Sequence, residues 1–277
     1  MDYYLRKYIS FLLLEESRNR ELALLPAIRG AQMRSLSELN SLLELINWDK
    51  KKLNLYISCA KLKAIPNFTF NMNKRSQEET HPWFLDKENG FESQVYESDI
   101  FFDFDADDIN EVLSDVKKVK EFFDNYEVPY QIIASGNKGM HLIIDGKYAP
   151  IKEVREGVVF PHKTFIENVK EALNLSSCDL SNVHLINRLR KLPFSLVLPK
   201  RFKECPEMCS EQIMNVALPL SDEMFNNFKP QDLILCNVLK KVKLIRMGNL
   251  ERFPNLSLEQ KKLNVQKILK EFDALWK

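Results

Sequence analysis

The chain of 277 residues carries 40 Lys and Arg against 39 Asp and Glu, a formal net charge of +1. This near-neutral balance excludes the large positive excess with which a protein binds nucleic acid nonspecifically through counterion release. Its longest purely apolar runs, such as Phe11 to Leu14, fall far below the roughly 20 residues that span a bilayer, so we expect no membrane association.

The N-terminal third is dominated by helical periodicity. Apolar residues recur at three- and four-residue steps over 4–12 and again over 36–46, which is the spacing of one helix face. A short strand is expected over 53–59 and a long polar surface loop over 67–93. We therefore predict a mostly helical N-terminal lobe over about residues 1–95.

The clearest pattern begins at residue 99. The sequence DIFFDFD over 99–105 indicates a strand that becomes acidic at one end. Asp107 or Asp108 can cap a following helix, whose apolar positions repeat at helical steps until Pro129 ends it.

Two further strands are expected over 130–134 and 140–145, joined by the glycine-containing turn 135–139. Together with the preceding elements they make a strand-helix-strand-turn-strand unit. This unit predicts an α/β fold with a small mixed sheet flanked by helices.

The remaining expected elements are a helix over 164–173, a basic stretch over 187–191, a β-leaning segment over 194–198 and a final helix over 258–276. We predict one compact domain over 1–277, with a catalytic core at about 96–200 and a C-terminal segment at about 201–277.

The acidic strand places two carboxylates on one face. Side chains alternate along a strand, so Asp103 and Asp105 project the same way while Phe102 and Phe104 point into the opposite, packed layer. Divalent cations relieve the repulsion between such carboxylates, and oxygen ligands suit Mg²⁺ or Mn²⁺. The alternative is a solvated strand end or a helix cap.

The turn SGNKG, followed by Met140 and His141, suits an anion. Gly136 and Gly139 permit positive φ and a close approach of backbone NH groups, Lys138 adds charge, and His141 adds a hydrogen-bond donor. Together they indicate a nucleoside triphosphate. The alternative is an ordinary hairpin with a histidine on its second strand.

A third element joins Asp179 to a basic run. Arg188, Arg190 and Lys191 lie within four positions and precede Pro-Phe-Ser, which favours phosphates or a template backbone. The alternative is a solvated basic face.

In combination these three elements resemble the catalytic small subunit of archaeo-eukaryotic DNA primases. The family's Asp-x-Asp strand is similar to FDFDADD, its Ser-Gly-x-x-Gly-x-His turn to SGNKGMH, and its third acidic motif to DLSNVHLINRLRKLPFS. Weaker similarity extends to Tyr3-Tyr4, to Arg20-Glu21 with Arg29, and to Tyr56-Ile57-Ser58, so the resemblance covers roughly residues 1 to 200.

The resemblance implies template-directed synthesis of short primers on single-stranded DNA, with Mg²⁺ or Mn²⁺ as cofactor. The implied metal ligands are Asp103, Asp105 and Asp179. The implied nucleotide-binding residues are Ser135, Gly136, Lys138, His141, Arg188 and Lys191, with Glu21 and Arg29 as weaker candidates at the nucleotide or template end.

Two departures from the family pattern reduce the expected triphosphate affinity. Asn137 replaces the first of two basic residues in the glycine turn, and Val197 stands where the family often has a histidine. A family zinc knuckle cannot lie in 108–135, which lacks Cys and His. A different zinc site from Cys205 and Cys209 with His162 or His184 has loose spacing, which disfavours structural zinc.

The resemblance also implies partners. Single-stranded DNA and nucleoside triphosphates are the expected ligands, and a large primase subunit is the expected protein partner. The five scattered cysteines and the lack of a secretory signal near Met1 indicate a soluble protein in a reducing compartment. The expected location is the cytoplasm if the source is archaeal, at the nucleoid, or the nucleus if it is eukaryotic.

Three alternatives stay open. A primase-polymerase of repair, plasmid or viral origin would use the same site to extend primers. A primase-like subunit that only binds DNA or other chains would need no catalytic carboxylates. IFFDFDAD also resembles the nucleophile strand of haloacid-dehalogenase-type phosphatases, but Asp107 stands where those enzymes have Thr or Val.

Overall fold

The computed structural model describes residues 3–4, 6–25, 28–31, 35–45, 54–65, 70–71, 86, 88–155, 157–181, 185–199, 208–241 and 252–274. Small sheets flanked by helices make up these residues, so the predicted α/β class is confirmed. Every strand pairing between named strands of these ranges is antiparallel, whereas the sequence favoured a mixed sheet. Antiparallel neighbours need only tight connections, such as the turn 135–139.

A five-stranded sheet, the acidic sheet, has the strand order β12-β7-β9-β8-β16 and carries Asp103 on β7, next to its edge strand β12. Its strands are β7 (Ile100–Phe104), β8 (Gln131–Ala134), β9 (Met140–Ile144), β12 (Cys178–Asp179) and β16 (Leu218–Leu220). The three strands predicted over 99–105, 130–134 and 140–145 are therefore confirmed, and they are neighbours in this sheet.

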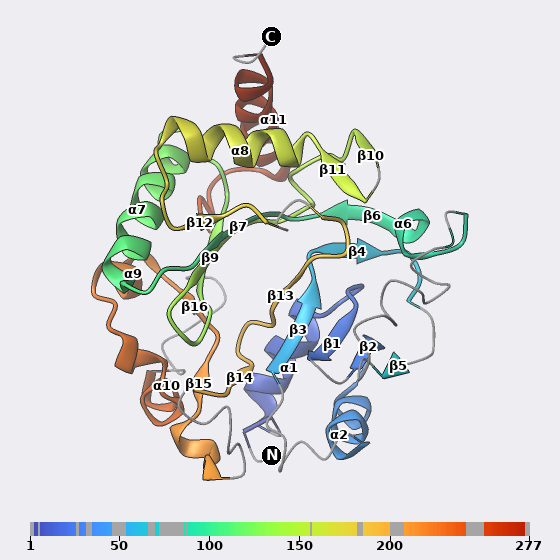
Figure 1. Ribbon diagram of the computed structural model, residues 1–277, viewed down its shortest axis with the longest axis vertical. Coiled ribbons are helices and arrows are strands. Elements are labelled where there is room, and N and C mark those ends of the chain that lie inside the picture. The colour runs from blue at the N-terminus through green and yellow to red at the C-terminus, as the bar shows by residue number, and fades with distance from the viewer. Residues whose placement is uncertain are drawn as a thin grey trace.

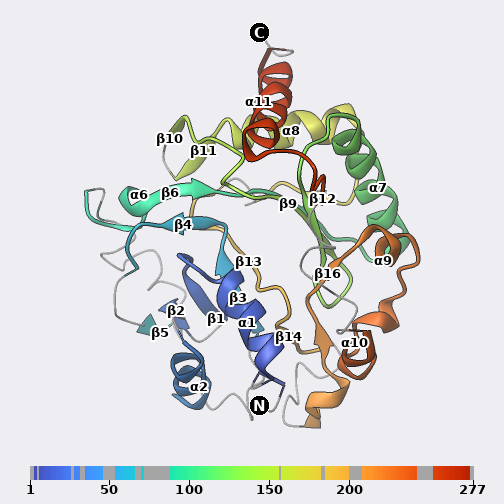
Figure 2. The same ribbon diagram turned by 180° about the vertical axis from the view of Figure 1, so that it is seen from behind.

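Helices cover one face of the acidic sheet (Figure 1): α7 (Ile109–Asn125) and α8 (His162–Ala172), with α11 (Leu258–Ala274) packed on α8 (Figure 2). Helix α7 begins where expected, because the Asp108 side chain accepts a hydrogen bond from the Asn110 backbone NH. Phe102 points into this layer, with its ring centroid 5.9 Å from that of Phe123 and 6.1 Å from that of Phe165. The opposite face, which carries Asp103, is left for the site.

A second five-stranded sheet faces that open side, with the order β13-β3-β1-β2-β5. Its strands are β1 (Leu22–Leu25), β2 (Ile28–Ala31), β3 (Asn54–Ser58), β5 (Phe70–Asn71) and β13 (Leu189–Lys191). Helices α1 (Lys7–Glu16) and α2 (Leu36–Leu45) accompany it. The prediction of a mostly helical N-terminal lobe needs correction, because this region supplies four of the five strands of the second sheet. Local periodicity could not show this, because the sheet is completed by β13, which is distant in sequence.

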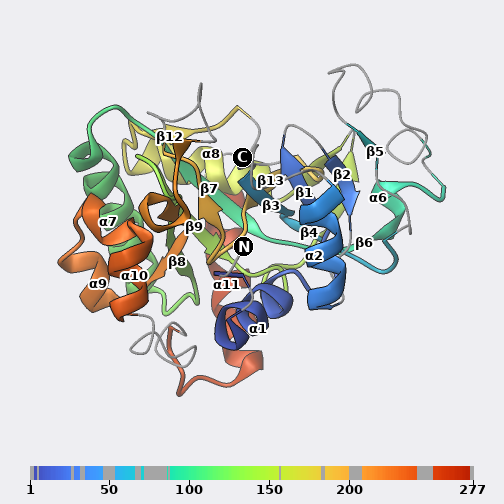
Figure 3. The ribbon, with the colours of Figure 1, turned by 90° about the horizontal axis from the view of Figure 1, so that it is seen from below.

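The remaining elements are short. They are β4 (Ala60–Leu62), α6 (Phe91–Gln94), β6 (Val95–Ser98), β10 (Glu153–Arg155), β11 (Val158–Phe160), β14 (Leu196–Val197), η3 (Glu211–Ile213), β15 (Asn215–Val216), α9 (Asp222–Asn226), η4 (Pro230–Leu233) and α10 (Leu235–Lys241). Figure 3 shows α6, β6 and β4 on one side of the molecule and α9 and α10 on the other. Of the helices in the described ranges, none has the length and apolar character that crossing a membrane requires.

Two tyrosines tie the start of the chain to the Pro-Phe-Ser stretch. The Tyr3 hydroxyl donates a 2.8 Å hydrogen bond to the Phe194 carbonyl, and the Leu196 NH donates a 2.9 Å bond to the Tyr4 hydroxyl. Phe194 has φ of 63°, a left-handed conformation that costs a non-glycine residue about 1–2 kcal/mol. The paired tyrosines therefore help to hold a strained turn beside the site.

A buried ion network links the two sheets. Asp99 accepts hydrogen bonds from Arg20 at 2.9 Å and from Arg190 at 3.3 Å, and all three side chains are at most 4% exposed. Arg190 also lies 3.6 Å from Glu16. Removing Asp99 would leave the buried Arg20 guanidinium without its carboxylate and Arg190 with the more distant Glu16 alone, which is strongly destabilising. The network fixes how β13 and β7 face one another.

Candidate active site

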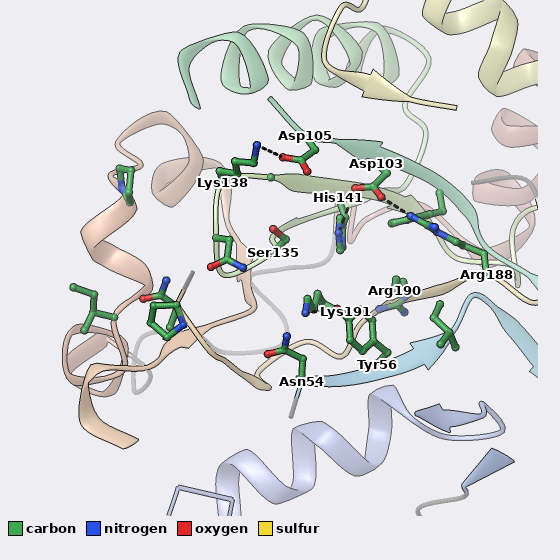
Figure 4. Close-up of a pocket in the computed structure, with 18 of the residues that line it drawn as sticks. Asn54, Tyr56, Asp103, Asp105, Ser135, Lys138, His141, Arg188, Arg190 and Lys191 are labelled. Carbon is green, nitrogen blue, oxygen red and sulfur yellow. Dashed lines mark hydrogen bonds and ion pairs between the residues drawn. The ribbon is translucent and has the colours of Figure 1, made fainter. Parts of the chain in front are cut away.

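An open cavity of about 780 Å³ lies between the acidic sheet and the second sheet (Figure 4). Seven of the residues that the resemblance implies as metal- or nucleotide-binding line it: Asp103, Asp105, Ser135, Lys138, His141, Arg188 and Lys191. They come from β7, the turn before β9, β9 itself and the segment through β13, which are distant in sequence. The fold thus brings most of the predicted site into one space.

Strand register places the acidic positions together. Asp103 lies opposite His141 on β9 and opposite Asp179 on β12. Directly opposed residues of antiparallel strands have Cβ atoms roughly 5 Å apart. Asp179 is absent from the described residues that line the cavity and is exposed on edge strand β12, yet it is a neighbour of Asp103.

Asp103 is the most enclosed of the three carboxylates. Its Oδ2 accepts a 2.7 Å hydrogen bond from Nη2 of Arg188, and its Oδ1 lies 3.6 Å from Nε2 of His141. Burial raises the pKa of the Asp103 carboxyl above its ordinary value; Arg188 opposes the shift and Asp179 adds to it. Extra positive charge at Asp103 and Asp179 would relieve this electrostatic cost.

Asp105, which directly follows β7, lies beside Lys138 of the glycine turn. Lys138 lies with its Nζ 3.6 Å from Oδ1 of Asp105 and donates a 2.7 Å hydrogen bond to Oδ1 of Asp107. Asp105 and Lys138 are 56% and 42% exposed, so solvent screens their attraction. Lys138 can therefore move from these carboxylates to a stronger anion when one is present.

The glycine turn is shaped by close packing. Gly136 has φ of +90°, and a Cβ there would lie 2.6 Å from Cγ2 of Val197. A Cβ on Gly139 would lie 2.6 Å from the Phe104 carbonyl oxygen. Both glycines are thus required by their surroundings, and Val197, where a family histidine was expected, packs against the turn. Gly136 itself is not among the described lining residues.

His141 is buried against the ring of Phe101, with centroids 4.9 Å apart. Burial lowers its pKa to about 3, and the positive charges of Arg190, Lys191 and Arg188 act in the same direction. The imidazole is therefore neutral at physiological pH, and it can donate one hydrogen bond to an anion without carrying charge.

The basic run divides between two roles. Lys191 donates a 2.6 Å hydrogen bond to the Tyr56 hydroxyl and lines the cavity. Arg190, by contrast, is buried and held by Asp99 and Glu16. All three cations line the cavity, but strand alternation turns Arg190 away from Lys191, and its guanidinium is already paired with Asp99.

The weaker candidates lie apart from these residues. Glu21 is fully buried just before β1 and is not among the described residues that line the cavity. Arg29 lies in β2, opposite Phe70, and its side chain is outside the described part of the structure. Cys205 and His184, two of the zinc candidates, are also outside the described residues, while Cys209 and His162 are buried.

Sequence reasoning missed Asp115, which holds β12 in place. Its carboxylate, on helix α7, accepts hydrogen bonds from the backbone NH of Ser177 at 2.8 Å, from the Ser177 hydroxyl at 2.9 Å and from Lys118 at 2.8 Å. The Asp105 NH in turn donates to the Ser177 carbonyl at 2.9 Å. An acidic residue within the apolar stripe of α7 was the signal that could have revealed it.

The C-terminal segment also contributes lining residues that no motif marked. They are Ile213, Asn215, Pro230, Gln231 and Ile234. From β3, Asn54 joins them without a motif, and Tyr56 joins them from the weak Tyr-Ile-Ser similarity. The Asn215 amide donates a 2.6 Å hydrogen bond to the Gly136 carbonyl. This wall is amide-rich and apolar, which suits a flat, hydrogen-bonding group better than a phosphate.

The carboxylates fit a divalent cation by donor type. No group of three His, Cys, Asp or Glu side chains within the described ranges stands ready to enclose a metal ion. Mg²⁺ is commonly bound by only one or two carboxylates together with water and substrate phosphates. The opposed pair Asp103 and Asp179, with Asp105 nearby, matches that mode of binding.

No protein-family model matches the chain, and no curated protein matches it. Among solved structures, the chain is similar to the polymerase domain of Ligase D from Mycobacterium tuberculosis, determined in complex with DNA. The two are 12% identical, the matched part covers 86% of this chain and 87% of that one, and the TM-score is 0.49. The roles of the site residues therefore rest on their own geometry.

Proposed function

We propose that the chain is a metal-dependent DNA nucleotidyltransferase of the primase-polymerase kind, which joins nucleotides opposite a single-stranded template. One observation carries the proposal: Asp103, flanked by Asp179, faces a cavity that is also lined by Arg188, Lys138 and Lys191. Nucleotidyl transfer requires this combination, because carboxylates hold the metal ions while cations neutralise the triphosphate.

Each residue has a role in this proposal. Asp103, Asp105 and Asp179 hold Mg²⁺ or Mn²⁺; bound ions of this kind stabilise charge on the attacking and leaving oxygens. Arg188 presents a planar guanidinium that can hold two phosphate oxygens at once. Neutral His141 donates a hydrogen bond to a phosphate or sugar oxygen, and the amide-rich wall accommodates a base.

Primer synthesis is the reaction that the motifs favour, with a large primase subunit as partner. The net charge of +1 provides no diffuse attraction for DNA, so a partner that holds the template would complete the enzyme. Primer extension by a self-sufficient primase-polymerase uses the same cavity. The two activities differ in whether the chain can join its first two nucleotides without a primer.

Labelled-nucleotide incorporation tests the proposal. The purified chain is incubated with single-stranded DNA, with or without an annealed primer, and with Mg²⁺ or Mn²⁺. Products on both templates support primase activity, and products on the primed template alone support extension. If neither template yields metal-dependent, template-complementary products, with or without co-purifying partners, the chain is a non-catalytic subunit and the proposal fails.

A further inference from the structure

The two cavity cations nearest the carboxylates already have acidic partners. Arg188 holds Oδ2 of Asp103 at 2.7 Å, and Lys138 lies between Asp105 and Asp107. Figure 4 shows Lys138 and Arg188 directed at Asp105 and Asp103 respectively. The same two carboxylates are the proposed metal ligands, so a metal ion and a protein cation compete for the same oxygens.

A metal ion that binds without nucleotide must break the ion pairs of these cations, and nothing replaces them. To reach both oxygens of Asp103 it must displace Arg188, whose side chain is only 24% exposed. The displaced guanidinium would then remain in a cavity that also holds Lys191 and borders Arg190. Positive charge would accumulate in a half-buried space, which opposes metal binding.

A triphosphate that arrives with the metal removes this cost. Its oxygens can accept from Arg188 and Lys138 as the metal takes over Asp103 and Asp105. Every charge then keeps a partner of opposite sign, and arginine gains a bidentate phosphate in place of one carboxylate oxygen.

We infer that Arg188 and Lys138 exchange partners, from carboxylates to phosphate, so that metal and nucleotide bind cooperatively at this site. The inference rests on the proposed function, since it takes a metal-nucleotide complex as the ligand. Cooperativity of this kind is reciprocal and typically amounts to about 5- to 150-fold in affinity.

Asp107 acts in the same exchange as a positioning residue. It is 97% exposed and takes the shorter contact with Lys138, 2.7 Å against 3.6 Å to Asp105. Without Asp107, Lys138 would lie closer to Asp105 and compete more strongly with a metal there. Asp107 thus keeps Asp105 accessible although it contacts neither substrate nor metal.

Binding of Mn²⁺ in the absence of nucleotide tests the exchange, with free Mn²⁺ followed by electron paramagnetic resonance. For Arg188→Gln in the full chain we expect Mn²⁺ alone to bind about 5-fold more tightly or better, because the competing cation is gone. The affinity of the same variant for a fluorescent nucleoside triphosphate should fall. Lys138→Gln, at a half-exposed side chain, should show the same pair of opposite effects and serves if Arg188→Gln does not fold.

Lys191→Gln is the matched control, because it removes a charge from the same cavity wall but from a lysine bonded to Tyr56. It should weaken nucleotide binding and leave the affinity for Mn²⁺ alone within about 2-fold. Asp107→Asn should weaken Mn²⁺ binding, whereas Asp108→Asn, an equal loss of charge that preserves the helix cap, should not.

The outcomes separate the two proposals. If nucleotide promotes Mn²⁺ binding but both Arg188→Gln and Lys138→Gln leave binding of Mn²⁺ alone unchanged or weaker, the exchange is refuted and the proposed function stands. Equal tightening by Lys191→Gln would also refute it, since any loss of charge would then suffice. If the wild-type chain binds neither Mn²⁺ nor nucleotide, both proposals fail.

Discussion

Asp179 lies opposite Asp103 in the antiparallel pairing of β12 with β7, and Asp115 of α7 holds the residue that leads into β12. The Asp115 carboxylate accepts hydrogen bonds from the backbone NH and from the hydroxyl of Ser177. The distance between the two proposed metal ligands therefore depends on a helix that never reaches the cavity.

We expect Asp115→Asn to weaken both stability and metal binding. The amide can keep its oxygen on the Ser177 NH and hydroxyl only by turning its NH2 group toward the Lys118 ammonium, so one end of the side chain meets a donor, at a cost of about 1–3 kcal/mol. Because β12 would shift, Mn²⁺ affinity in the presence of nucleotide should fall about 10-fold or more. Urea unfolding and Mn²⁺ titration measure the two effects.

The control for Asp115→Asn is Glu121→Gln on the same helix, where the side chain is 64% exposed. It should change the free energy of unfolding by less than about 0.5 kcal/mol. If Asp115→Asn lowers stability but leaves Mn²⁺ affinity equal to that of the control, Asp115 has only a structural role.

Gly136→Ala should destabilise the glycine turn for two separable reasons. The φ of +90° disfavours any Cβ, and Val197 leaves no room for one. We expect a total cost of about 2–4 kcal/mol, of which the backbone strain is about 1–2 kcal/mol. Gly157→Ala isolates the strain, because Gly157 has φ of +75° and no described atom lies within 4 Å of the position that a Cβ would take there.

A double-mutant cycle with Val197→Ala completes this test. The smaller side chain should offset part of the Gly136→Ala cost, and only part, because the Cβ of Val197 itself would lie 2.8 Å away. Equal costs at Gly136 and Gly157 by thermal or urea unfolding would show that the contact with Val197 is unimportant.

Acid should destabilise the protein partly through His162. Burial lowers the pKa of this first residue of α8 to about 4, below the usual 6.5. As pH falls, the unfolded chain therefore binds the proton before the folded protein does. The contribution of neutral His162 to the free energy of unfolding is fully present above pH 6.5 and is lost as pH falls toward 4. One such proton corresponds to a slope of about 1.4 kcal/mol per pH unit.

His162→Gln removes the group that binds this proton on unfolding. Urea unfolding at about pH 7.5, 6.0 and 5.0 should give a shallower pH dependence for the variant than for the wild type. The remaining dependence in this window includes His141, whose pKa burial lowers to about 3. Parallel pH curves for the two proteins would contradict the assignment of His162.

Single-stranded DNA should bind the isolated chain weakly and with strong salt dependence. If about three phosphates are contacted, a fourfold rise in salt lowers the affinity roughly 20-fold. Fluorescence anisotropy with a labelled oligonucleotide between about 50 and 200 mM salt measures this dependence. Nanomolar binding that is insensitive to salt would favour a self-sufficient polymerase that needs no template-holding partner.

The elements that could be predicted from the sequence are those with local signals. Alternation in 99–105 identified β7 and the inward direction of Phe102, and the cap expected at Asp107 or Asp108 located the start of α7, where Asp108 is the cap. The glycine turn was recognised because its conformation needs glycine. These features depend on a few neighbouring residues and so are visible in a short window.

Other features depend on contacts between distant segments. β1, with the sequence LALL, fits a helix as well as a strand, and only its pairing with β3 decides the matter. Arg190 looks like its neighbours in the basic run, but its guanidinium is paired with the buried Asp99 although the residue still lines the cavity. Asn215 and Gln231 reach the cavity only through the tertiary fold.

Template-directed nucleotide incorporation by the wild-type chain and by the double variant Asp103→Asn/Asp179→Asn tests the central claim most directly. With a primed template, Mn²⁺ and the single complementary nucleotide, the wild type should extend the primer. The double variant should be slower by at least about 100-fold, because metal ligation contributes several kcal/mol to transition-state stabilisation, while its circular dichroism stays that of the wild type. Equal rates for the two folded proteins would contradict the assignment of these carboxylates as the catalytic centre.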